Sequence, residues 1–196
     1  MFEVRIHGRG GQGVVTAAEM LSLAAFDEGR YAQAFPSFGS ERMGAPVVSF
    51  CRIDDHEIRL REPVMEPDVL IIQDPTLLHQ VDVFGGLKRD GFILINSAKS
   101  FDELGLGDFG KDYRHERLLT VPASELARDH TGRPLANAAL LGGFAALSGL
   151  ISLDAVASAI QERFRGVVGE GNVAAARAAH AWVTDELREL TGAASG

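Results

Sequence analysis

The feature that most constrains this chain is a run of glycines close to its beginning. Residues 8–13 read Gly-Arg-Gly-Gly-Gln-Gly, which matches the pattern G-x-G-x-x-G. The alternating segment Phe2–His7 precedes the run, and apolar residues at helical spacing follow it from Val14 to Asp27. A strand, a glycine turn and a helix in this order form the context in which the pattern binds phosphates. The sequence therefore predicts a Rossmann-like βαβ unit at the N-terminus.

A glycine loop in this position favours anions for two physical reasons. Glycine lacks a Cβ atom, so the backbone can approach a phosphate closely, and the first amides of the following helix favour negative charge. The alternative is a tight turn that needs glycine only for positive φ. Four glycines in six positions exceed the need of a turn. We therefore predict a cofactor-binding loop made of Gly8, Arg9, Gly10, Gly11, Gln12 and Gly13.

A nicotinamide site would also need an acidic residue at the end of the second strand, where it holds the ribose hydroxyls. The second predicted strand, Tyr31–Phe35, runs instead into Pro36 and Ser37. Asp27 and Glu28 precede this strand, at the end of the helix, and are on its wrong side. The sequence thus disfavours a nicotinamide enzyme and leaves the identity of the anion open.

Two apolar runs later in the chain, Val69–Gln73 and Gly91–Asn96, are typical of strands buried on both faces of a parallel sheet. Asp54-Asp55 predicts a turn that pairs the preceding strand with residues 57–60 as an antiparallel hairpin. Further strands are expected at 47–53 and 118–121, and further helices at 123–128, 136–150, 153–164 and 173–190.

These elements predict an α/β fold, a three-layer sandwich around a mostly parallel sheet with an added antiparallel hairpin. We expect one domain over residues 1–191 and a flexible tail at 192–196. Ser152 and Asn172 are the expected N-caps of the last two helices. The small residues of 136–150 predict close helix packing, either within the chain or against a partner.

Composition and charge narrow the possible functions. A net charge of -8 disfavours nucleic acid and anionic membranes as partners. No apolar run reaches the roughly 18 residues of a membrane span, so we expect a cytoplasmic protein. Cys51 is the single cysteine, which excludes a disulfide or a cysteine-ligated cluster within this chain. We expect Cys51 to be an inert core residue, and we find neither a catalytic triad nor a metal-ligand set.

Other candidate binding residues follow strands of the predicted sheet. Ser37, Ser40 and Arg42 come after the second strand, and a parallel sheet would place them beside the glycine loop. An arginine can bind phosphate bidentately. The alternative is a solvated loop in which Glu41 pairs with Arg42.

Asp74 and Asn96 each end one of the buried apolar runs. They face the same crevice as the glycine loop if the sheet is parallel, and we include both as candidate cofactor-binding residues. The alternative is that they cap the turn or helix that follows. His7 and Asn137 are expected to be a strand-terminal residue and a helix cap, respectively.

Two long segments resemble the gamma subunit of 2-oxoacid:ferredoxin oxidoreductases, most closely the pyruvate type and including phenylglyoxylate-type relatives. The first is Gly8–Val15 and the second is Tyr31–Val47, which is too long and idiosyncratic to match by chance. The resemblance continues through Arg52–Asp55, Ile58-Arg59, Glu62-Pro63, Asp74–Leu77, Ile95–Ser97, Asn137, Leu141-Gly142 and Glu162–Phe164. It therefore spans nearly the whole chain.

The resemblance implies one subunit of an enzyme that oxidises pyruvate or a related 2-oxo acid to an acyl-CoA and carbon dioxide. It implies that this chain contacts coenzyme A and helps to close the active site. Thiamine diphosphate, Mg²⁺ and [4Fe-4S] clusters would reside in partner subunits: alpha, beta and a ferredoxin-like delta. Electrons would pass to ferredoxin or a similar acceptor. The alternatives are a stand-alone nicotinamide- or flavin-binding oxidoreductase and a non-catalytic nucleotide-binding assembly module.

The sequence itself also indicates association with partners. Phe35 and Phe38 flank a turn and cannot both point into the core of a small domain. We therefore expect at least one of them to be an interface anchor, since aromatic anchors dominate interface energetics.

Overall fold

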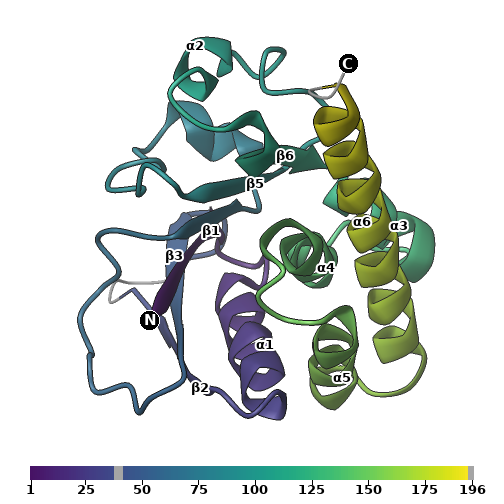
Figure 1. Cartoon of the computed structure of the whole chain (residues 1–196). Coiled ribbons are helices and arrows are strands. Elements are labelled where there is room, and N and C mark those ends of the chain that lie inside the picture. The colour runs from purple at the N-terminus through teal and green to yellow at the C-terminus, as the bar shows by residue number, and fades with distance from the viewer. Residues whose placement is uncertain (38–41, 194–196) are drawn as a thin grey trace.

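The computed structural model describes residues 1–37 and 42–193 as an α/β domain (Figure 1). Within these residues the strands are β1 (Phe2–Arg9), β2 (Tyr31–Pro36), β3 (Pro46–Asp54), β4 (Val69–Ile72), β5 (Phe92–Asn96) and β6 (Leu118–Val121). The α-helices are α1 (Val14–Asp27), α2 (Gly107–Gly110), α3 (Ala123–Thr131), α4 (Asn137–Ser148), α5 (Leu153–Arg163) and α6 (Gly166–Ala193). Two 3-10 helices, η1 (Pro75–His79) and η2 (His115–Arg117), complete the described elements.

The strands form one mixed sheet in the order β2-β3-β1-β4-β5-β6. β1, β4, β5 and β6 pair in parallel, whereas β3 is antiparallel to both of its neighbours, β1 and β2. The predicted mostly parallel α/β sheet with an added hairpin is therefore confirmed. The hairpin itself consists of β2 and β3. The predicted strand at 57–60 is wrong, because β3 has a partner on each edge and offers no free edge for a chain leaving Asp54.

Helices and irregular segments cover the two faces of the sheet unequally (Figure 1). The larger apolar core lies between the sheet and α1, α3, α4, α5 and α6. The second face packs against short elements and loops, through a smaller core that includes Leu77, Val83 and Leu106. The segment 101–115 contains only the short α2 and the start of η2. The third layer of the sandwich is thus made of turns rather than long helices.

Helix α4 is the central helix of the larger core, and ten of its residues are buried. Gly142 faces α6 so closely that a Cβ atom there would collide with the backbone carbonyl of Ala176. The sequence left open whether the small residues of this helix pack within the chain or against a partner. On this surface of α4 they pack within the chain. Cys51 is also fully buried, and burial raises the pKa of its thiol to about 12.

The two C-terminal helices test the predicted caps. Ser152 caps α5 as predicted, accepting a hydrogen bond from the amide of Ala155 at 3.1 Å. The predicted start of the last helix at 173 is wrong, because α6 begins at Gly166. Asn172 lies inside α6 and donates to the carbonyl of Val168 at 2.9 Å. Gly169 and Gly171 allow this part of α6 to approach the backbone of Phe164 and His130 closely.

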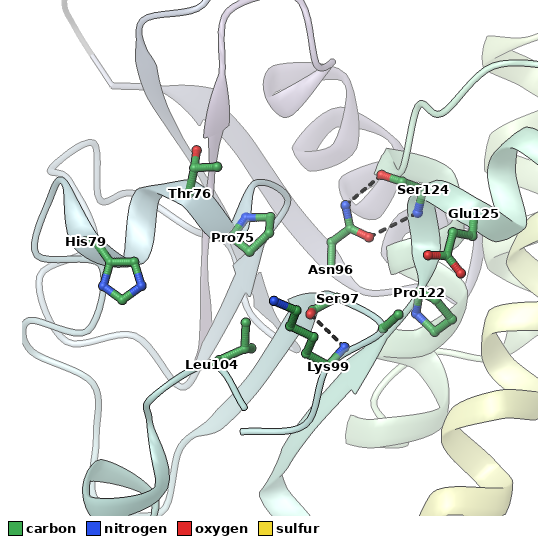
Figure 2. Close-up of a pocket in the computed structure, with 11 residues that line it drawn as sticks. Pro75, Thr76, His79, Asn96, Ser97, Lys99, Leu104, Pro122, Ser124 and Glu125 are labelled. Atoms are coloured by element: carbon green, nitrogen blue, oxygen red, sulfur yellow. Dashed lines mark hydrogen bonds between the residues drawn. The ribbon is translucent and has the colours of Figure 1, made fainter. Parts of the chain in front are cut away.

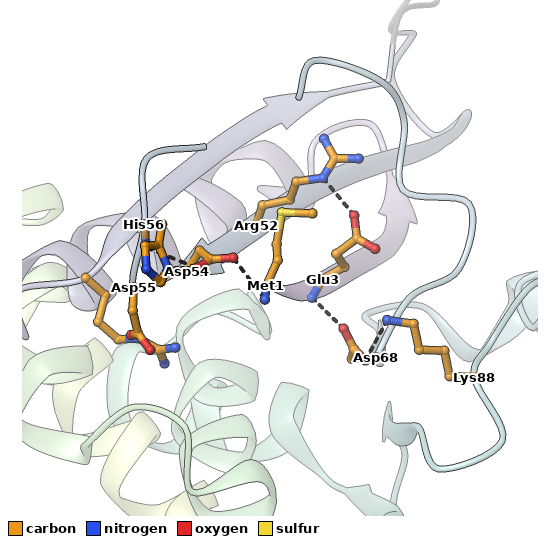
Figure 3. A network of polar contacts seen from close by, with 9 residues as sticks. Met1, Glu3, Arg52, Asp54, Asp55, His56, Asp68 and Lys88 are labelled. Carbon is orange, nitrogen blue, oxygen red and sulfur yellow. Dashed lines mark hydrogen bonds and ion pairs between the residues drawn. The ribbon is translucent and has the colours of Figure 1, made fainter. Parts of the chain in front are cut away.

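A set of polar contacts ties the start of β1 to its neighbours, at the edge of the sheet opposite the glycine loop (Figure 3). Glu3 accepts a hydrogen bond from Arg52 at 2.8 Å, and its backbone amide donates to Asp68 at 2.8 Å. Asp68 also pairs with Lys88 at 2.8 Å. These contacts fasten β1 between β3 and β4 and so hold the strand that carries the glycine loop.

Two buried polar residues of β1, Arg5 and His7, face the second layer. Arg5 donates to the ring of His7 at 3.1 Å and to the carbonyl of Val83 at 3.1 Å. Its guanidinium thereby fixes a loop against the sheet. Burial, reinforced by the nearby charge of Arg5, lowers the pKa of His7 to about 4.

We predict that Gly142→Ala destabilises the chain by about 1–3 kcal/mol, the usual cost of overpacking a well-packed core. Gly143→Ala on the same helix is the matched control. A Cβ atom there meets only side-chain ends, the nearest at 3.2 Å. Denaturant unfolding of both variants gives the comparison, and equal stabilities would contradict the packing assigned to Gly142.

We predict that His7 makes stability depend on pH between about 6.5 and about 4. In this window the unfolded chain binds a proton that the folded chain does not, so stability falls as the pH is lowered. The loss reaches about 3 kcal/mol for a shift of this size. His7→Gln keeps an acceptor for Arg5 and removes the titration. The difference in unfolding free energy between wild type and variant should therefore vary with pH, and a constant difference would refute the assignment.

Candidate functional site

The glycine loop lies at the carboxyl edge of the sheet, between β1 and α1, as predicted. Residues 42–45 pack directly against it. The amide of Gly10 donates to Ala45 at 2.9 Å, and the carbonyl of Gly10 accepts from Gly44 at 3.0 Å. A Cβ atom on Gly10 would collide with the carbonyl of Arg42. Close packing within the chain thus accounts for one of the four glycines.

Gly11 and Gly13 adopt positive φ values of 92° and 69°, which side chains other than glycine rarely accept. Gly13 is the N-cap of α1, and no side chain caps this helix. Within residues 1–37 and 42–193, five consecutive or near-consecutive amides have no hydrogen-bond partner. They belong to Gly11, Gly13, Val14, Val15 and Thr16. Such a set of amides at a helix N-terminus is an anion-binding arrangement.

Asn137 supports this loop from α4, a contact that the sequence did not reveal. Asn137 is buried, and its side-chain amide donates to the carbonyl of Gly13 at 3.3 Å. Its nitrogen lies 2.5 Å from the place where a Cβ of Gly13 would stand. The left-handed turn at Gly13 is therefore held by Asn137 from the side of α4. The side-chain oxygen of Asn137 accepts from the amide of Ala138 at 2.9 Å. The expected role of Asn137 as a helix cap is nevertheless wrong, because the N-cap of α4 is Ala136 and no side chain caps this helix.

Arg9 and Gln12 join the loop to the segment that follows β4. Both donate to one carboxylate oxygen of Asp74, Arg9 at 3.1 Å and Gln12 at 2.8 Å. Arg9 also donates to the hydroxyl of Thr76 at 2.7 Å and to Gln80 at 2.7 Å. The guanidinium predicted to bind the anion is thus occupied by contacts within the chain.

The other carboxylate oxygen of Asp74 caps η1. It accepts from the amide of Thr76 at 2.9 Å and from its hydroxyl at 2.6 Å. Burial alone would raise the pKa of Asp74, but the hydrogen bonds from Thr76 and Gln12 and the charge of Arg9 outweigh it and lower the pKa. Asp74 is therefore an anion that organises the loop, and the capping alternative describes its contacts.

A cavity of about 530 Å³ opens beside this network, at the carboxyl ends of β4, β5 and β6 (Figure 2). Its wall includes Thr76, which also contacts Arg9 and so borders the glycine loop. The remaining lining residues are Pro75, His79, Asn96, Ser97, Ala98, Lys99, Leu104, Pro122, Ser124 and Glu125. Several of them directly follow predicted strand ends, which is the signal by which the sequence could have identified them.

Asn96 lines this cavity and joins three elements. Its side-chain amide donates to the carbonyl of Gln73 at 2.8 Å and to the hydroxyl of Ser124 at 2.8 Å. Its oxygen accepts from the amide of Ser124 at 3.0 Å, which caps α3 (Figure 2). The contacts of Asn96 are again those of the capping alternative, and a binding role for it stays a prediction.

Gln73, buried at the end of β4, is a polar residue that the sequence placed in an apolar strand. Neither atom of its side-chain amide has a hydrogen-bond partner among the described residues. Its oxygen lies 3.0 Å from the place where a Cβ of Gly8 would stand. The absence of a side chain at Gly8 thus makes room for this amide beneath the loop.

The remaining candidate residues belong to β2 or come after it in the sequence. Ser37 and Arg42 are exposed, and Arg42 reaches the loop through its backbone carbonyl rather than its guanidinium. Ser40 and Phe38 lie outside the described residues, so their expected roles stay predictions. Phe35 packs within the chain, with its ring 5.1 Å from that of Phe50.

Among the described residues, no group of three or more His, Cys, Asp or Glu side chains is arranged to hold a metal ion. None of the helices in the same part of the chain has both the length and the apolar surface that a membrane span requires.

Comparisons with known proteins identify the family. A family model described as pyruvate ferredoxin/flavodoxin oxidoreductase matches residues 3–182. The chain is 48% identical over 191 residues to pyruvate synthase subunit PorC of Methanothermobacter thermautotrophicus, covering 97% of this chain and 98% of that protein. It is 48% identical over 179 residues to the common gamma subunit of the pyruvate/ketoisovalerate oxidoreductases of Pyrococcus abyssi, covering 91% and 95%.

A solved structure agrees. Pyruvate oxidoreductase subunit PORC of Thermotoga maritima superimposes with a TM-score of 0.77 at 34% identity, over 92% of this chain and 95% of that one. The chain therefore belongs to the pyruvate ferredoxin/flavodoxin oxidoreductase family. The predicted assignment as a gamma subunit of a 2-oxoacid oxidoreductase is confirmed, and the comparisons do not support a stand-alone nicotinamide or flavin enzyme.

Proposed function

We propose that this gamma subunit binds coenzyme A for its enzyme and helps to close the active site around it. The reaction is the oxidation of pyruvate or a related 2-oxo acid to an acyl-CoA and carbon dioxide. The observation that carries the proposal is the set of unpartnered amides at the start of α1, those of Gly11 and of residues 13–16. Coenzyme A is an anion with several phosphates, and such amides favour phosphate through both hydrogen bonds and the helix dipole.

The cavity beside the loop supports the same proposal. Its volume of about 530 Å³ is in the usual range of small-molecule sites. Lys99 and His79 stand at its wall and supply cationic and hydrogen-bonding groups. In this proposal the phosphates contact the loop, and the rest of the molecule extends along the cavity past Thr76.

The redox chemistry belongs to partners in this proposal. Alpha, beta and ferredoxin-like delta subunits would hold thiamine diphosphate, Mg²⁺ and [4Fe-4S] clusters, and a cytoplasmic ferredoxin or similar acceptor would take the electrons. The support comes from the curated relatives, each of which is named as one subunit of a larger enzyme. The single cysteine of this chain is buried and cannot ligate a cluster by itself.

We predict that the purified chain alone has no oxidoreductase activity, and that activity returns when the partner subunits are added. The measurement is dye reduction that depends on a 2-oxo acid and coenzyme A. Turnover by the cluster-free single chain would refute the division of labour proposed here.

We predict that Gly11→Val raises the KM for coenzyme A by about tenfold or more in the assembled enzyme. The reason is that a β-branched side chain blocks close approach of a phosphate and strains a backbone with positive φ. Gly29→Val is the matched control, because Gly29 has a φ of 77° at the other end of α1. A normal KM in an assembled Gly11→Val enzyme would reduce the loop to a structural turn.

A further inference from the structure

Gln73 follows β4 directly and is only 3% exposed, and the proposed function assigns it no role. Among residues 1–37 and 42–193, it is the only residue in which two side-chain polar atoms are both buried and without a hydrogen-bond partner. These atoms are the oxygen and the nitrogen of its carboxamide. An unpaired buried polar group costs free energy until a ligand or a water molecule pairs with it. The carboxamide of Gln73 is therefore a candidate for a contact that the chain does not supply by itself.

The lack of partners is confined to the side chain, because both neighbouring strands fix the backbone of Gln73. Its amide donates to the carbonyl of His7 in β1 at 2.8 Å. Its carbonyl accepts from the side chain of Asn96 in β5 at 2.8 Å. Gln73 thus has a defined position at the carboxyl edge of the sheet, and the unpaired carboxamide is not the sign of a loose segment.

This position lies between the glycine loop and the cavity at the carboxyl edge, because β4 lies between β1 and β5 in the sheet. The side-chain oxygen of Gln73 is 3.0 Å from the place where a Cβ of Gly8 would stand. Asn96, which bonds to Gln73 from β5, lines the cavity (Figure 2). A ligand that has its phosphates at the loop and its remainder in the cavity therefore passes beside Gln73.

The side chain of Gln12 lies beside the same point of the loop. Its oxygen is 3.1 Å from the place of the Gly8 Cβ atom, and the residue is half-buried. Two hydrogen bonds hold the carboxamide of Gln12 there, one to Asp74 at 2.8 Å and one from the amide of Arg9 at 2.8 Å. Glutamine has three rotatable side-chain bonds, so Gln12 can turn outward while the backbone of the loop stays in place. Such a turn gives a ligand at the loop access to Gln73.

The chemistry of the carboxamide selects the part of the ligand that can pair with it. A carboxamide needs both an acceptor for its nitrogen and a donor for its oxygen. A phosphate only accepts hydrogen bonds, so it would leave the oxygen unpaired. A secondary amide has one N–H and one carbonyl, and the pantetheine arm of coenzyme A carries such amides. The adenine edge also has a donor and an acceptor, but its rigid double ring needs a wider opening than a thin chain does.

We propose that the carboxamide of Gln73 pairs with an amide of the pantetheine arm of coenzyme A. The inference rests on the proposed function, since it assumes that the phosphates contact the glycine loop. Gln12 turns away as the arm enters between the loop and the cavity. Gln73 is then a binding residue that aligns the arm, and it makes this subunit prefer ligands that have the arm over those that have only the nucleotide end.

The test is the variant Gln73→Met, in which a side chain of similar length lacks both polar atoms. Because no partner is lost within the described part of the chain, thermal unfolding should show the variant to be at least as stable as the wild type. In the assembled enzyme the KM for coenzyme A should rise by about tenfold, the effect of losing the paired hydrogen bonds. The kcat at saturating coenzyme A should stay unchanged, because the contact is the same before and during the reaction.

A second ligand separates the arm from the nucleotide end. Adenosine 3′,5′-bisphosphate has adenine and phosphates but no pantetheine arm, and we expect it to compete with coenzyme A. Its inhibition constant should be the same for Gln73→Met and for the wild-type enzyme. It should rise in Gly11→Val, because that variant obstructs the phosphates at the loop.

Gln33→Met is the matched control, because the side-chain oxygen of Gln33 in β2 is also buried without a partner among the described residues. It should change neither constant. An unchanged KM for coenzyme A in Gln73→Met would overturn the proposal and would indicate that water pairs with the carboxamide. Equal losses for coenzyme A and the bisphosphate would overturn it too, since the contact would then be with the nucleotide end. If the bisphosphate did not inhibit the wild-type enzyme, the proposed function itself would be contradicted, and this inference with it.

Discussion

The carboxylate of Asp74 is the contact on which the geometry of the carboxyl edge depends. One oxygen accepts hydrogen bonds from Arg9 and Gln12 of the glycine loop, and the other accepts two from Thr76 at the start of η1. The half-buried carboxylate of Asp74 thus joins the end of β1 to the end of β4. Without it, Gln12 would lose its carboxylate acceptor, and Arg9 would keep only neutral partners, on Thr76, Gln80 and Gly44.

Because of this contact, the side chains and the backbone amides of the glycine loop have different roles. The side chains of Arg9 and Gln12 are directed to Asp74, and the side-chain oxygen of Gln12 also accepts from the backbone amide of Arg9. The backbone amides of Gly11 and of residues 13–16, in contrast, stay open. Asn137 holds the turn at Gly13 from the opposite side. The groups of the loop that are open to an anion are therefore backbone amides, whereas the charged side chain of Arg9 makes contacts within the chain. This division agrees with a subunit that binds and positions a ligand while redox groups are carried elsewhere.

Local patterns predicted much of this fold, and tertiary contacts explain what they missed. The alternation of Phe2–His7 and the helical spacing after Gly13 identify β1 and α1. In β1 the apolar side chains join the larger core, while the polar Arg5 and His7 are buried on the other face. The false strand at 57–60 arose because sequence cannot show that β3 is already paired on both edges. The late start predicted for α6 arose because Gly169 and Gly171 are there for close packing, not to end a helix.

Sequence patterns also predicted the candidate site only in part. The pattern G-x-G-x-x-G located the loop, but it did not show that residues 42–45 cover Gly10 or that Arg9 is engaged by Asp74. These contacts join positions far apart in the chain, as does the contact from Asn137 to Gly13. Asp74 and Asn96 were found correctly at strand ends. Their caps, however, depend on which helix or turn the fold brings to each end.

In the proposed function, the open amides of the glycine loop contact the phosphates of coenzyme A. Amide hydrogen exchange of the assembled enzyme, followed peptide by peptide, tests this directly. Coenzyme A should slow exchange across residues 11–16, and pantetheine, which has the thiol arm without the phosphates, should not. Unchanged exchange in this segment with coenzyme A bound, or equal protection by pantetheine, would contradict the claim.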